Sequence, residues 1–96
     1  MNIEITHSAE RKAISAVFSV GDNWFYADIV NLPYIGNECE IFKADKDGKV
    51  TDWTELYCNR DVEVSEAFLL RCIREFCEEN GYDSEWVNRT SKQYWW

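Results

Sequence analysis

The chain has 96 residues, with 18 acidic and 10 basic side chains and a formal net charge of −8. This charge repels nucleic acid and anionic membranes, so direct binding to either is not expected. Because 46% of the residues are hydrophobic and 16% are aromatic, the chain can build a core, which excludes a disordered acidic tail. The length predicts a single domain over residues 1–96.

The first strand pattern is followed by a turn and a second strand. Apolar residues alternate through Lys12–Val20, with Ile14 and Phe18 on the same face. Gly21, Asp22 and Asn23 then supply turn chemistry, and Trp24–Val30 is rich in aromatic and β-branched residues. These segments predict an antiparallel hairpin. A loop over Asn31–Asn37 is expected next, because its proline has no amide hydrogen for a strand ladder.

A second hairpin is predicted from Glu38–Ala44 and Val50–Cys58, joined by the Asp- and Gly-containing turn at Asp45–Lys49. Neither face of the second of these strands is cleanly apolar. This indicates either a position at the sheet edge or aromatic residues used for binding. Met1–Thr6 is expected to add a short fifth strand, with its two isoleucines facing inward.

One helix is expected over Ser65–Asn80, because its apolar residues form a single stripe at helical period. Ser65 can cap the start of the helix, and Gly81 suits the residue just past its end. Glu78 and Glu79 stand at the end where the helix dipole disfavours negative charge. The whole pattern predicts an α+β fold, in which one amphipathic helix packs on a four- to five-stranded, mainly antiparallel sheet.

Several aromatic residues are expected to pack between the sheet and the helix: Trp24, Phe25, Tyr26, Phe42, Trp53 and Tyr57. The remaining aromatics near the C-terminus leave two interpretations open. Either this segment folds back to seal the sheet, or it anchors a partner, since Trp and Tyr are enriched among interface hot spots. These residues are Trp86, Tyr94, Trp95 and Trp96.

No cofactor or metal site is expected from the sequence. The cysteines have no Cys-x-x-Cys spacing, His7 is the only histidine, and the turn at Asp45–Lys49 has too few ligands for a calcium loop. The N-terminus lacks the pattern of a signal peptide, and no apolar run is long enough to span a membrane. A cytoplasmic protein with reduced thiols is therefore expected. Its cysteines are expected to be small buried hydrophobes, namely Cys39, Cys58, Cys72 and Cys77.

The acidic excess is concentrated in one part of the chain. Residues 1–37 have a net charge of −2, residues 38–85 of −8, and residues 86–96 of +2. An acidic surface on a compact body can occupy the Lys and Arg grooves that proteins use to hold phosphates. The candidate partner-binding residues are Glu38, Glu40, Asp45, Asp47, Asp52, Glu55, Glu75, Glu78 and Glu79, with Trp86, Trp95 and Trp96 from the aromatic end of the chain.

The composition and the acidic run from Glu38 through Glu85 resemble the small inhibitors encoded by phages and mobile elements, including anti-CRISPR proteins. Several proteins of that class mimic nucleic acid with carboxylates. The resemblance implies a non-enzymatic inhibitor that binds a basic, nucleic-acid-handling site on a partner protein, such as a CRISPR effector complex or a nuclease. Two alternatives stay open: an immunity protein that neutralises a basic nuclease toxin, and a general protein-interaction domain whose charge only promotes solubility.

Overall fold

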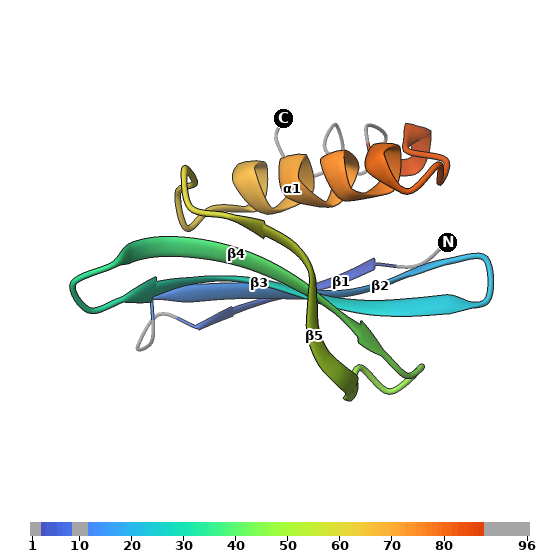
Figure 1. Cartoon of the computed structure of the whole chain (residues 1–96), viewed down its shortest axis with the longest axis horizontal. Coiled ribbons are helices and arrows are strands. Elements are labelled where there is room, and N and C mark those ends of the chain that lie inside the picture. The colour runs from blue at the N-terminus through green and yellow to red at the C-terminus, as the bar shows by residue number, and fades with distance from the viewer. Residues whose placement is uncertain (1–2, 9–11, 88–96) are drawn as a thin grey trace.

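The computed structural model describes residues 3–8 and 12–87, and has an antiparallel sheet of five strands with one main helix (Figure 1). The strands follow one another across the sheet in chain order, from β1 at one edge to β5 at the other. This architecture confirms the predicted α+β fold and the fifth strand. Among the described residues, no helix is long and apolar enough to cross a membrane. The elements are β1 (Ile3–Ser8), β2 (Ala13–Val20), β3 (Asn23–Leu32), β4 (Gly36–Ala44), β5 (Val50–Asn59) and α1 (Glu66–Glu79).

Short turns join the inner strands. Val20 pairs with Asn23 across a two-residue turn, and Gly21 has the positive φ of 60° that a type II′ turn requires at its first position. The predicted loop over Asn31–Asn37 is too long, because Leu32 still pairs with Gly36. Here the Asn31 side chain donates a 2.8 Å hydrogen bond to the side-chain oxygen of Asn37. The ladder therefore continues almost to the turn that contains Pro33.

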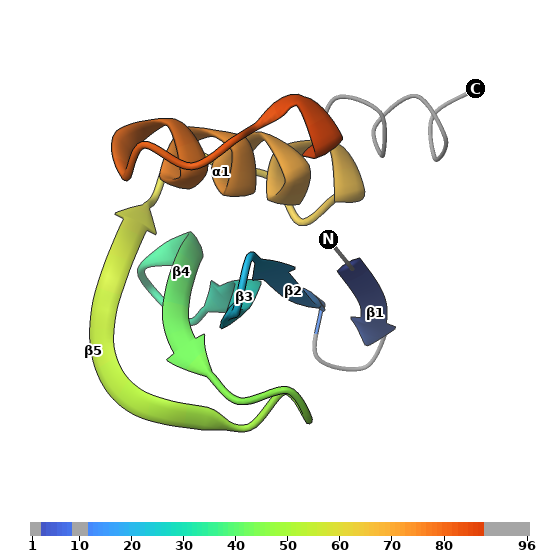
Figure 2. The same ribbon diagram turned by 90° about the vertical axis from the view of Figure 1, so that its right-hand side faces the viewer.

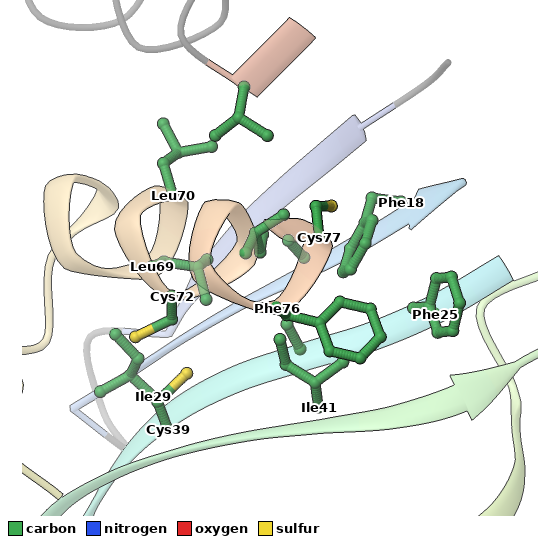
Figure 3. Packing of buried hydrophobic residues seen from close by; sticks show 14 of the residues in the cluster. Phe18, Phe25, Ile29, Cys39, Ile41, Leu69, Leu70, Cys72, Phe76 and Cys77 are labelled. Atoms are coloured by element: carbon green, nitrogen blue, oxygen red, sulfur yellow. The ribbon is translucent and has the colours of Figure 1, made fainter. Parts of the chain in front are cut away.

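The core lies between α1 and one face of the sheet (Figures 1 and 3). The alternating residues predicted to face inward on β2 are buried there, and Phe18 is 0% exposed. Its ring packs against those of Phe25 and Phe76, with centroids 5.3 and 6.2 Å away. At the start of the helix the Ser65 hydroxyl accepts the backbone N–H of Phe68 at 3.2 Å, as the capping prediction requires. Burial of this apolar face is the main stabilising contribution to the fold.

Beyond the helix the chain turns back and adds one more aromatic side chain to the core. A short helical turn at residues 85–87 places Trp86 5.9 Å from the Phe18 ring, with only 5% of the residue exposed. Trp86 therefore belongs to the core, in line with the interpretation that this segment folds back onto the sheet, and its contact with a partner stays a prediction. Tyr94, Trp95 and Trp96 lie outside the described residues.

Strand β5 bends sharply and curls around the edge of the sheet (Figure 2). Ile41 of β4 pairs with Tyr57, whereas Lys43, two residues later, pairs with Asp52, five residues earlier on β5. The three extra residues form a bulge that bends β5 below the face opposite the helix. The β4–β5 loop there approaches β2 closely, since a Cβ on Gly48 would lie 2.7 Å from a Val17 methyl.

The curl and the strand alternation place four aromatic residues on the face that points away from α1. Phe25 and Ile41 are buried in the core, so their strand neighbours point to the opposite side. Six aromatic residues were predicted to pack between sheet and helix. The prediction holds for Phe25 and Tyr57 and is wrong for the other four. The four are Trp24, Tyr26, Phe42 and Trp53.

Candidate functional site: the acidic outer face

The face of the sheet opposite α1 collects acidic side chains from β3, β4 and β5. In the strand register Asp28 lies opposite Glu40, and Glu40 lies opposite Cys58. Glu38 is two residues before Glu40 and shares its face, because the intervening residue points into the core. The β5 bulge adds Glu55 to the group. These five residues, Asp28, Glu38, Glu40, Glu55 and Cys58, are called the acidic outer face below.

The side chains of the acidic outer face are close together. One oxygen each from Glu38 and Glu55 and the sulfur of Cys58 all lie within 4.8 Å of one another. The Cys58 thiol donates a 3.3 Å hydrogen bond to the Glu38 carboxylate. Glu38 is only 6% exposed, and Arg60 Nε lies 3.9 Å from its carboxylate. A buried carboxylate is thus held among other acidic groups, with one exposed arginine at the edge.

Burial and this crowding of negative charge favour the protonated form of Glu40. Burial raises the pKa of the Glu40 carboxyl to about 7, and a hydrogen bond with Glu38 acts in the same direction. The negative charges of Glu38, Glu55 and Asp28 add to the effect. Glu40 is therefore partly protonated at neutral pH, because a further negative charge on this face is unfavourable in the free protein.

Cys58 departs from the prediction that all four thiols are buried. It is exposed, whereas Cys39, Cys72 and Cys77 are buried as predicted. In the regular part of the ladder Cys58 lies opposite Glu40, so that it faces the carboxylates and not the core. Desolvation and the hydrogen bond to Glu38 raise the pKa of its thiol to about 11. At neutral pH the Cys58 sulfur is thus protonated and weakly nucleophilic.

Glu38, Glu55 and Cys58 are also a possible ligand set for a metal ion. Two carboxylates and one thiolate suit zinc, which would need one more ligand for tetrahedral coordination. The cysteine and histidine spacings considered in the sequence could not indicate this set, because its members come from two strands and meet only through the bulge. The expected absence of a metal or cofactor stays a prediction.

Two of the candidate acidic residues stabilise turns. The Asp45 carboxylate accepts the backbone N–H groups of Asp47 and Lys49 at 2.9 and 3.0 Å. The Asp52 carboxylate accepts the N–H of Thr54 at 2.9 Å, a bond that lowers the Asp52 pKa. Asp45 and Asp52 therefore hold the β4–β5 loop and the bulge in shape, whatever else they contact.

The acidic residues of α1 lie away from the outer face, on the other side of the sheet. The Glu75 carboxylate accepts a 2.6 Å hydrogen bond from the Tyr57 hydroxyl, which places it at the junction of β5 and α1. Glu78 lies 3.9 Å from Arg74 Nε, and Glu79 is exposed at the helix end. The structure therefore divides the candidate set between two sides of the molecule, and only Glu38, Glu40 and Glu55 gather closely.

Beside the acidic outer face the bulge exposes two large apolar side chains. Trp53 is 72% exposed and touches the buried Phe42 ring edge-on, with centroids 5.1 Å apart. Leu56 is 45% exposed. The mixed faces of this strand indicated aromatic residues used for binding as one alternative, whereas nothing in the local pattern singled out Leu56. Exposed apolar groups next to charge are typical of protein-binding surfaces.

Comparisons of the chain with known protein families, curated proteins and solved structures gave no significant match. The acidic outer face and its apolar neighbours are the features of the described residues on which the proposal below rests. They combine closely spaced carboxylates, a proton that is held near neutral pH and an exposed tryptophan.

Proposed function

We propose that the chain is a small acidic, non-enzymatic inhibitor that binds a basic, nucleic-acid-handling site on a partner protein. The observation that supports this most is the packing of Glu38, Glu40 and Glu55 into one cluster, in which Glu40 retains a proton near pH 7. A partner lysine or arginine would relieve the repulsion within this cluster. A CRISPR effector complex or a nuclease is the class of partner proposed, with a cytoplasmic setting as part of the same proposal.

Binding through this face combines two contributions. The carboxylates speed encounter with a basic groove and make binding sensitive to salt. Trp53 and Leu56 add apolar area beside the charged centre, where a desolvated aromatic contact contributes most to affinity. Because a basic partner favours ionised Glu40, the complex should release a proton on forming, and its affinity should rise between pH 6 and pH 8.

The proposal is tested by displacement of labelled nucleic acid from purified CRISPR effector complexes and nuclease toxins, followed by fluorescence anisotropy. Glu55→Lys should weaken inhibition by about tenfold or more, because it replaces attraction with repulsion at a close charge pair. Glu79→Lys is the matched control, since it changes the net charge equally at the exposed end of α1. Raising the salt concentration should weaken inhibition by the wild-type protein more than inhibition by the Glu55→Lys variant.

The outcome also separates the alternatives. Displacement from an effector complex favours the inhibitor, and displacement from a toxin alone favours an immunity protein. Equal effects of Glu55→Lys and Glu79→Lys would contradict a localised acidic contact. If no member of either panel releases its nucleic acid, the proposed class of function is wrong.

A general protein-interaction domain is a second candidate, and the 72% exposure of Trp53 favours it. In that case Trp53→Ala should abolish partner binding while Glu55→Lys leaves it intact. The inhibitor proposal expects both variants to weaken binding, with strong salt dependence for the wild-type protein.

A further inference from the structure

Two cysteine thiols face each other between the sheet and the helix, on the side away from the acidic outer face. Cys39 is on β4 and Cys72 on α1, and they are 0% and 1% exposed. Their side chains are hydrogen-bonded to each other. Figure 3 shows both sulfur atoms in the space between the helix and the strand. The fold thus brings together two thiols that are 33 positions apart in the chain.

The two thiols differ chemically. Cys39 donates its hydrogen to Cys72, which raises the Cys39 pKa and lowers that of Cys72. Nearby Arg71 acts in the same direction, and the Tyr57 hydroxyl on β5, which donates its hydrogen to Glu75, stabilises the Cys72 thiolate only when it turns from Glu75 to the sulfur. Burial and the Glu75 carboxylate oppose this effect. Cys72 is therefore the more nucleophilic member of the pair, and Cys39 holds the proton.

A cavity of about 300 Å³ gives small molecules a way to reach Cys72. It lies between the end of β5 and the first turns of α1, and Cys72 forms part of its wall together with Asn59, Phe68 and Arg71. A single water molecule takes up about 30 Å³ of liquid, so the cavity has room for a small polar reagent. The Arg71 guanidinium lies 5.6 Å from the centre of the Phe68 ring, which places a cation in the same wall.

We propose that Cys72 and Cys39 are a redox-active dithiol, in which a small hydroperoxide enters this cavity and oxidises the pair to a disulfide that joins α1 to β4. The Cys72 thiolate attacks one peroxide oxygen and breaks the O–O bond. Cys72 becomes a sulfenic acid, and the departing hydroxide takes up the proton that Cys72 gave up. The Cys39 thiol then attacks the Cys72 sulfur, and its proton leaves with the hydroxyl group as water. With hydrogen peroxide, two thiols and one peroxide yield one disulfide and two waters.

The disulfide would join two elements that already share the core. It needs its sulfur atoms at about 2.05 Å, so oxidation draws the Cys39 and Cys72 side chains, and the elements that carry them, closer together. The other two cysteines lack this arrangement and serve as internal controls. Cys58 is exposed beside carboxylates, and Cys77 is buried on α1, with the pKa of each thiol raised to about 11.

The test uses the full chain, reduced and then treated with one equivalent of hydrogen peroxide under native conditions. Trypsin cleaves after Lys43, Arg60, Arg71 and Arg74, so the four cysteines fall in four different peptides. Mass spectrometry without reduction should find the Cys39 peptide linked to the Cys72 peptide, with the loss of two hydrogen atoms. Cys39→Ser should instead leave a Cys72 sulfenic acid that a dimedone probe traps.

Tyr57→Phe provides a test of rate. It keeps the ring but removes the hydroxyl that can turn from Glu75 to the Cys72 thiolate, and should slow oxidation by up to about tenfold, because a hydrogen bond to a charged group contributes that order of stabilisation. Cys77→Ser should leave both the rate and the linkage unchanged. Peroxide that oxidises Cys58 or Cys77 first, or that leaves Cys39 and Cys72 unlinked in the folded wild-type chain, overturns the proposal. The wild-type linkage needs no variant, so this result stands even if a substitution prevents folding.

Discussion

The two faces of the sheet come from alternate residues of the same strands, yet they have opposite chemistry. The face below α1 is almost entirely apolar, with Phe18, Ile29 and Ile41 each at most 1% exposed. The outer face carries the buried carboxylate of Glu38 and the exposed ring of Trp53. The first face stabilises the fold through burial of apolar area. The second places charge where it is unfavourable, which is a common property of functional sites.

The two faces also differ in the hydrogen bonds that their polar groups make. On the covered face, the Tyr57 hydroxyl donates to Glu75 at the rim, and the Asn59 amide donates to the same hydroxyl at 3.3 Å. On the outer face Glu38 and Glu40 share a hydrogen bond that requires a proton. Substitutions on the covered face should therefore lower stability, whereas many on the outer face should change pH dependence and binding.

The largest effect is expected from removing an aromatic ring on the covered face. Phe18→Ala should lower the free energy of unfolding by about 3–5 kcal/mol, since it deletes a fully buried ring among Phe25, Phe76 and Trp86. Trp53→Ala removes a larger ring from the outer face and should cost about 1 kcal/mol or less, because that ring is mostly solvated. Urea unfolding of both variants measures the contrast, and similar losses would contradict the assignment of the two faces.

Thiol labelling gives a second comparison, between Cys58 on the outer face and Cys77 in the core. The pKa of each thiol is raised to about 11, with desolvation as the first cause in both. A difference in rate therefore reports access and not ionisation. Iodoacetamide at pH 8 should label Cys58 at least about tenfold faster than Cys77, and both rates should rise with pH. Faster labelling of Cys77 in the folded protein would mean that the helix does not cover it.

Local periodicity was enough to predict the covered face. Alternation on β2 identified Ile14 and Phe18 as inward residues, and the stripe on α1 identified Ile73 and Phe76. Both patterns can be recognised in the sequence, because buried positions recur every two residues in a strand and about every 3.6 residues in a helix. The Ser65 cap was predictable for the same reason, since its partner is only three residues away.

The outer face could not be predicted in the same way, because it depends on contacts between strands. The bulge at Trp53–Leu56 interrupts the alternation of β5, and the regular pairing with β4 that follows it places Cys58 beside Glu38. Glu55 joins Glu38 only after that bend, at a separation of 17 positions in the chain. Composition indicated an acidic surface, but the position of its centre on β4 and β5, away from the helix, follows from tertiary structure.

The smallest expected effect is the pH dependence of stability that arises from Glu40, a residue of the outer face. Its folded-state pKa of about 7 lies above the ordinary value of 4.5, so the folded protein binds this proton more tightly than the unfolded chain. The associated stability is fully present below about pH 4.5 and is lost as the pH rises toward 7. Because Glu40 is partly solvated, we expect a loss of only about 1 kcal/mol between pH 5 and pH 8.

Glu40→Gln removes the ionisation and keeps the size of the side chain. The variant should therefore be more stable than the wild-type protein by about 1 kcal/mol at pH 8, with little difference at pH 5. Glu79→Gln, at the exposed end of α1, removes the same charge without touching the outer face and is the matched control. Urea unfolding of all three proteins at both pH values measures the difference. A Glu40→Gln variant that is less stable than the wild type at pH 8 would show that the ionised carboxylate stabilises the fold, and would remove the electrostatic basis for binding at this face.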